Sequence, residues 1–105
     1  PEMSRGLGDV YKRQTLYGAE AKYLSAQLMY NAGEYAAAEK EILNFIDQST
    51  PHAYWLARSF ILLSDVYVAM DKKLDARQYL LSLQQNYHAD DDIERMIQER
   101  LEKLK

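Results

Sequence analysis

The chain has 105 residues, enough for one compact domain, and its 48% hydrophobic and 28% charged residues are typical of folded proteins. It contains no cysteine, which excludes disulfide bonds, thiolate metal sites and cysteine nucleophiles. The net charge of -3 includes no long basic run, so neither nucleic acid nor an anionic membrane is an expected partner.

Residues 1–14, PEMSRGLGDVYKRQ, are expected to form an unstructured tail. They hold two of the four glycines and show no helical periodicity. The string MSRGLGDVYKRQ also resembles translated adapter sequence that recurs at the ends of reading frames from metagenomic assemblies. We therefore predict that the tail is not native and that the folded domain covers residues 15–105.

The first pair of helices is predicted between residues 16 and 48. Apolar residues recur at three- and four-residue intervals from Leu16 to Asn31, which indicates a helix. Gly33 is expected to end this helix, because glycine takes the left-handed backbone conformation without a side-chain clash. A second helix is expected from about Glu34 to Asp47.

A third helix is predicted from about Pro51 to Met70. Thr50 can cap its free amides, and Pro51 fits a first turn whose N–H has no helical partner. Apolar side chains surround most of this helix, so we expect it to be packed on several sides. Polar residues interrupt its apolar stretch, which also falls short of the roughly 20 apolar residues of a membrane span.

Two further helices are expected near the end of the chain. A polar break at residues 71–73 precedes a fourth helix that ends near Tyr87, and an amphipathic fifth helix covers about 91–104. Asp90, Asp91 and Asp92 lack the alternating ligand spacing of a calcium loop, so they are expected to cap the fifth helix. With barely two heptads, that helix is favoured as a solvated cap over a coiled-coil arm.

The helix pairs form an internal repeat. Shifting the chain by 38 residues aligns similar side chains in the two copies, at about 16–48 and 51–87. The aligned pairs are Leu24 with Leu62, Ala26 with Ser64, Leu28 with Val66, Met29 with Tyr67, Ala38 with Ala76, and Ile42 with Leu80.

These residues resemble the tetratricopeptide repeat, which has a small residue and an aromatic on its first helix, a Gly-acid-aromatic turn, an alanine on its second helix and a closing proline. The matching positions are Ala26, Tyr30, Gly33-Glu34-Tyr35, Ala38 and Pro51 in the first copy, and Phe60, Ser64, Tyr67 and Ala76 in the second. Asp71 departs from the pattern at the turn glycine, and Phe45 and Leu83 replace usually small residues. The spacing also exceeds the family's ~34 residues by about one helical turn.

The resemblance implies an all-α fold, namely a solenoid of two antiparallel helix hairpins plus a C-terminal capping helix that could also begin another repeat. Short side chains at Ala26, Ser64, Ala38 and Ala76 would allow the helices to cross closely. The stretches TPHAYWLARSFILLSDVY and ARQYLLSLQQNY further resemble the C-terminal part of large tetratricopeptide proteins of Bacteroidota-type bacteria. Localisation in the cytoplasm or in the periplasm and cell envelope is left open.

One candidate binding surface follows from helical spacing. Each predicted stripe contributes three residues to it: Tyr23, Gln27 and Tyr30 on the first helix, and Arg58, Ile61 and Asp65 on the third. The resemblance places these helices along a concave groove. Equally, Tyr23 and Tyr30 could pack on upstream repeats, and Arg58 and Asp65 could be a solvated edge. The side chains that hold a terminal carboxylate in some family members are absent, so a clamp of that kind is not expected.

No catalytic chemistry is predicted. The spacings typical of nucleotide, hydrolase and zinc-protease sites are absent, and His52 and His88 lack a clear carboxylate partner. We expect no metal, no cofactor and no enzyme activity, although an accessory region of an enzyme stays open.

The expected function is a protein-interaction or scaffold module that presents a concave helical groove to a peptide or partner protein. The alternative is a structural spacer or terminal cap of a larger array, with upstream repeats as its only partner. An apolar edge around Leu16, Tyr17 and Leu24 also predicts weak self-association.

Overall fold

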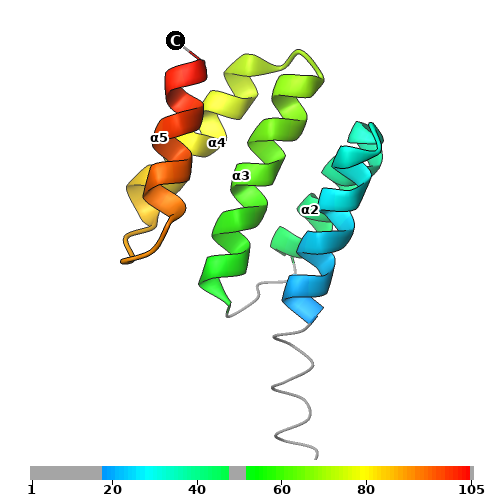
Figure 1. Ribbon diagram of the computed structural model, residues 1–105, viewed down its shortest axis with the longest axis horizontal. Coiled ribbons are helices and arrows are strands. Elements are labelled where there is room, and N and C mark those ends of the chain that lie inside the picture. The colour runs from blue at the N-terminus through cyan, green and yellow to red at the C-terminus, as the bar shows by residue number, and fades with distance from the viewer. Residues whose placement is uncertain (1–17, 48–51, 105) are drawn as a thin grey trace, which may run out of the picture.

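The computed structural model describes residues 18–47 and 52–104, and these residues are all-helical, with no strand among them (Figure 1). A first helix covers 18–31 and is followed by α2 (Tyr35–Asp47), α3 (Ala53–Ala69), α4 (Lys73–Asn86) and α5 (Ile93–Lys103). The predicted all-α class and the order of the helices are confirmed. The predicted tail at 1–14 and the predicted helix starts at Leu16 and Pro51 lie outside the described residues.

The turn between the first helix and α2 is a Schellman motif centred on Gly33. The Gly33 N–H donates to the carbonyl of Tyr30 at 3.0 Å, and the Glu34 N–H donates to the carbonyl of Met29 at 2.8 Å. Gly33 has a φ of 81°, in the left-handed region that glycine enters without steric cost. The predicted role of Gly33 is therefore confirmed.

The turn between α3 and α4 has the same hydrogen bonds 38 residues later, although aspartate replaces glycine there. The Asp71 N–H donates to Val68 at 3.1 Å, and the Lys72 N–H donates to Tyr67 at 2.7 Å. Asp71 has a φ of 62°, a conformation that aspartate tolerates better than most residues. Asp71 thus departs from the repeat pattern in residue type, but its backbone has the same left-handed turn conformation as Gly33.

Helix α3 is the centre of the molecule and packs against α2, α4 and α5 (Figure 1). Eight of its residues are buried, which confirms the prediction of a helix packed on several sides. It begins at Ala53, two residues after the predicted start near Pro51, with His52 at the N-cap and no side-chain cap bond. The predicted cap, Thr50, lies outside the described residues.

Several small side chains lie buried between the helices. Ala26, Ala38 and Ala76 are buried in one cluster that the first helix, α2, α3 and α4 share. Ser64 is also buried, and its hydroxyl donates to the carbonyl of Ile61 at 2.6 Å, so its polar group is satisfied. All four residues are therefore buried, and their predicted place at helix crossings stays a prediction.

Helix α5 closes a second apolar cluster against α3 and α4, built around Ile93 and Ile97. Asp91, just before the N-cap, accepts the Ile93 N–H at 3.0 Å, whereas the N-cap residue Asp92 makes no side-chain cap bond. The predicted capping role of the aspartates is therefore confirmed for Asp91 alone. Among the described helices, none combines the length and apolar character of a membrane span.

Candidate functional site

The six residues predicted to line a groove lie in three different surroundings. Three join one hydrogen-bonded network between the first helix and α3: Tyr23, Gln27 and Arg58. Tyr30 and Asp65 meet at a pocket further along α3. Ile61 is 1% exposed and belongs to the cluster that α5 covers, so its side chain does not reach the surface.

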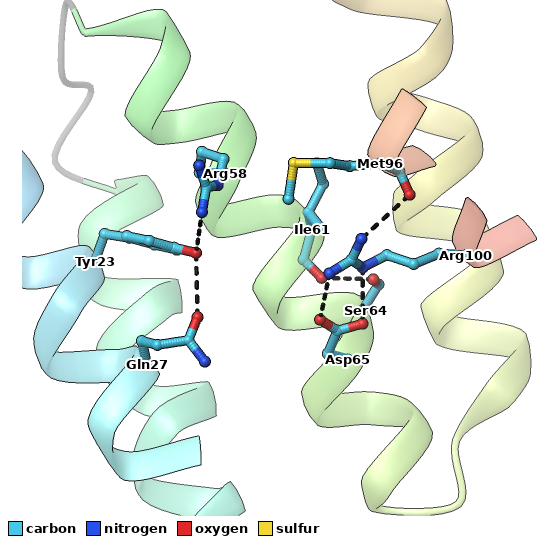
Figure 2. A network of polar contacts seen from close by, with 8 residues as sticks. All are labelled: Tyr23, Gln27, Arg58, Ile61, Ser64, Asp65, Met96 and Arg100. Atoms are coloured by element: carbon cyan, nitrogen blue, oxygen red, sulfur yellow. Dashed lines mark hydrogen bonds and ion pairs between the residues drawn. The ribbon is translucent and has the colours of Figure 1, made fainter. Parts of the chain in front are cut away.

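Arg58 is the centre of the network (Figure 2). Its Nη2 donates to the Tyr23 hydroxyl at 3.0 Å, and that hydroxyl donates onward to Gln27 Oε1 at 3.1 Å. Its Nη1 donates to the Tyr54 hydroxyl at 2.9 Å, which in turn donates to Asp92 Oδ1 at 3.0 Å. The network therefore connects the first helix, α3 and the N-cap of α5.

The surroundings of Arg58 favour its charged form. Burial alone would lower its pKa, but the bonds to the Tyr54 and Tyr23 hydroxyls outweigh burial and raise the pKa above its ordinary value. The guanidinium carbon also lies 5.0 Å from the centre of the Tyr23 ring, within range of a cation–π contact. The buried Nε has no hydrogen-bond partner among the described residues.

Tyr23 is a packing residue in this structure. It is 6% exposed, and its ring centre lies 5.5 Å from that of Trp55. Such an aromatic pair contributes about 0.5–1.5 kcal/mol beyond its buried area. Within the described residues, the partners of Tyr23 on α3 are Trp55 and Arg58.

Asp65 and Arg100 form a two-point ion pair between α3 and α5 (Figure 2). Arg100 Nε donates to Asp65 Oδ1 at 2.9 Å, and Nη2 donates to Oδ2 at 3.0 Å. Each side chain is 25% exposed, so the pair is neither fully buried nor freely solvated. A parallel pair of charged hydrogen bonds is specific in orientation as well as distance, so the pair is a directional polar contact between α5 and α3.

A pocket of about 540 Å³ lies beside this ion pair. Tyr30 from the first helix, Asp65 from α3 and Arg100 from α5 all line it, and residues of α4 complete it. Burial and then the Asp65 carboxylate raise the pKa of Tyr30, and Arg100 opposes this shift. The pocket is thus the place where the first helix, α3 and α5 meet.

Three residues of the site were missed from the sequence. Tyr54, Asp92 and Arg100 each bind a side chain of another helix or its cap, and none belongs to the predicted stripes. Arg58 binds Tyr23, and Arg100 binds Asp65, across the same separation of 35 residues.

A second pocket, of about 460 Å³, lies at the connection between α4 and α5. Tyr87, His88 and Ile97 are among its lining residues, and none of the six predicted residues contributes to it. Within the described ranges, no group of three histidine or carboxylate side chains is arranged to hold a metal ion.

Comparison of the chain with protein-family models, with curated proteins and with solved structures gave no match. The resemblance to the tetratricopeptide repeat therefore stays a prediction, supported by the residues named above.

Proposed function

We propose that this chain is a protein-interaction or scaffold module of the tetratricopeptide type. In this proposal the first helix with α2, and α3 with α4, are two antiparallel hairpins of a solenoid, and α5 is its capping helix. Support comes from the two Schellman turns at Gly33 and Asp71, which have the same hydrogen bonds 38 residues apart. The buried Ala38 and Ala76 share that spacing.

The pocket beside the Asp65–Arg100 pair is the observation that carries the proposed binding function. Its volume falls within the range of about 300–1,000 Å³ that ligand sites occupy. Four helices supply its polar lining, and this convergence on one concavity is typical of a binding site. A peptide or partner protein would therefore contact Tyr30 and Val68 at this pocket, whereas Tyr23 and Ile61 do not line it.

Selection from a random heptapeptide library, followed by fluorescence polarisation, tests this proposal. Val68 lines the pocket and is 39% exposed, so Val68→Trp should fill it and weaken the selected peptides at least tenfold. Leu74, 81% exposed on α4, does not line the pocket, so Leu74→Trp is the matched control and should bind unchanged. Equal binding by both variants, with unchanged circular dichroism, would contradict the proposal.

The alternative function, a structural spacer or terminal cap without a ligand, is favoured by a different observation. Asp65 and Arg100 satisfy each other, and Arg58 is held by two tyrosine hydroxyls, so these charges already have partners within the chain. Failure to select any peptide above background would support this alternative. In either case, the proposed role is binding or structural and not catalytic.

A further inference from the structure

The charged residues that line the pocket of Tyr30, Asp65 and Arg100 are not balanced. Three cations and two carboxylates line it. Asp65 is bound by Arg100, and Glu99, the other carboxylate of the lining, lies 3.7 Å from Arg95. The remaining two cations, Lys73 and Lys103, have no ion-pair partner among the described residues. The pocket thus offers two free ammonium groups on a chain whose net charge is -3.

Apart from Tyr30 and Ser64, the rest of the lining is apolar. Val68 and Ala69 come from the end of α3, Leu80 from α4 and Leu104 from the end of α5. Leu80 is almost completely buried, so it forms the floor, whereas the two lysines are exposed and lie at the rim. A group that fills this pocket would meet an apolar floor below and positive charge at the edge.

We propose that the pocket recognises an acidic side chain flanked by an apolar residue in a peptide segment. This inference rests on the proposed binding function and names the chemistry of its partner. The apolar residue would cover Val68 and Leu80, and the neighbouring carboxylate would pair with Lys73 and Lys103. Positive charge at the pocket edge would also speed the association of acidic peptides and disfavour positively charged ones.

The lining favours a side-chain carboxylate over a chain terminus. Lysine is a flexible point charge, which suits a carboxylate at the end of a mobile side chain. The pocket lining contains no asparagine or glutamine, whose amide donors would hold a terminal carboxylate at a fixed angle. The acidic residue is therefore expected within the segment and not at its end.

The experiment selects heptapeptides from two random libraries, one flanked by linkers and one with a free C-terminus. The chain is compared with the double variant Lys73→Gln/Lys103→Gln. The matched control, Lys40→Gln/Arg77→Gln, removes the same charge from exposed residues that do not line the pocket. Exposed ion pairs contribute modestly, so loss of both lysines should weaken acidic peptides about three- to tenfold.

The expected result is enrichment of Asp or Glu beside Leu, Met or Phe in the linker-flanked library, lost in the pocket variant and kept in the control. Peptides selected without an acidic preference, or with one that Lys73→Gln/Lys103→Gln leaves intact, would overturn this inference and leave the proposed function standing. Enrichment of acidic peptides only in the library with free C-termini would show that the pocket binds a terminal carboxylate, and would overturn the proposal of a side-chain carboxylate. Selection of no peptide by the parent chain would overturn both proposals.

Discussion

The ion pair between Asp65 and Arg100 gives a quantitative prediction about how α5 is attached. Two charges about 4 Å apart attract by roughly 4 kcal/mol at the effective dielectric near a protein surface, before desolvation and side-chain ordering oppose them. Exposed pairs retain about 0.2–1 kcal/mol, and loss of one partner from a buried pair costs about 3–5 kcal/mol. Because each side chain is 25% exposed, we expect a coupling free energy of about 1–2 kcal/mol.

A double-mutant cycle measures this coupling. The free energy of unfolding is determined from urea titrations followed by Trp55 fluorescence and circular dichroism for Asp65→Asn, Arg100→Gln and the double variant. The same helix supplies the control, because Arg95 and Glu99 are 3.7 Å apart with side chains 72% and 59% exposed.

The control cycle, Arg95→Gln with Glu99→Gln, should give a coupling below about 0.5 kcal/mol, and salt should abolish it. A coupling at Asp65 and Arg100 no larger than that of the control would refute the reasoning. The two-point geometry would then be a contact without energetic consequence, and the apolar packing of Ile93 and Ile97 alone would hold α5 in place.

Four further predictions concern packing, turn conformation, pH and association. Ala38→Leu should overpack a fully buried site and cost about 1–3 kcal/mol of unfolding free energy, whereas the exposed neighbour Ala37→Leu should cost almost nothing. Asp71→Gly should raise the thermal midpoint by relieving its left-handed conformation, a gain of about 0.5–1 kcal/mol. Burial and the Asp91 carboxylate raise the pKa of Tyr87 from 10.0 to about 12. The stability linked to this group is therefore complete below pH 10 and lost as pH rises through 12, and Tyr87→Phe should reduce that loss in alkaline melts. Leu28→Gln should lower any self-association seen by analytical ultracentrifugation, because Leu28 is 68% exposed.

The helices were predictable because their signals are local. A glycine after an amphipathic stretch commonly ends a helix, as Gly33 does here. Small residues such as Ala38 and Ala76 indicate that two helices approach each other closely. Asp71 was harder, because an aspartate gives a weaker turn signal than glycine. The backbone conformation there is imposed by the packing of α3 on α4 together with the turn hydrogen bonds.

The candidate site was predictable only in part, because its geometry depends on how separate helices dock. Ile61 and Asp65 share one stripe of α3, yet Ile61 is covered by α5 and Asp65 is only partly covered. No local sequence pattern predicts where α5 packs against α3 and α4. Treating α5 as a solvated cap therefore hid the role of Arg100, which projects from the partly buried edge of that helix.

The two outer flanks of the molecule differ in chemistry, and this difference limits how copies of the chain can associate. The first helix exposes Leu24 and Leu28, whereas α5 exposes the charged pair of Arg95 and Glu99. Head-to-tail stacking would place exposed leucines against charges, which desolvates those charges without replacing their water contacts. Pairing of two first helices would instead bury the leucines of both copies in an isologous contact, which closes at two subunits. Association should therefore stop at the dimer, and a continuous rise in mass with concentration would show that the flanks pair in another way.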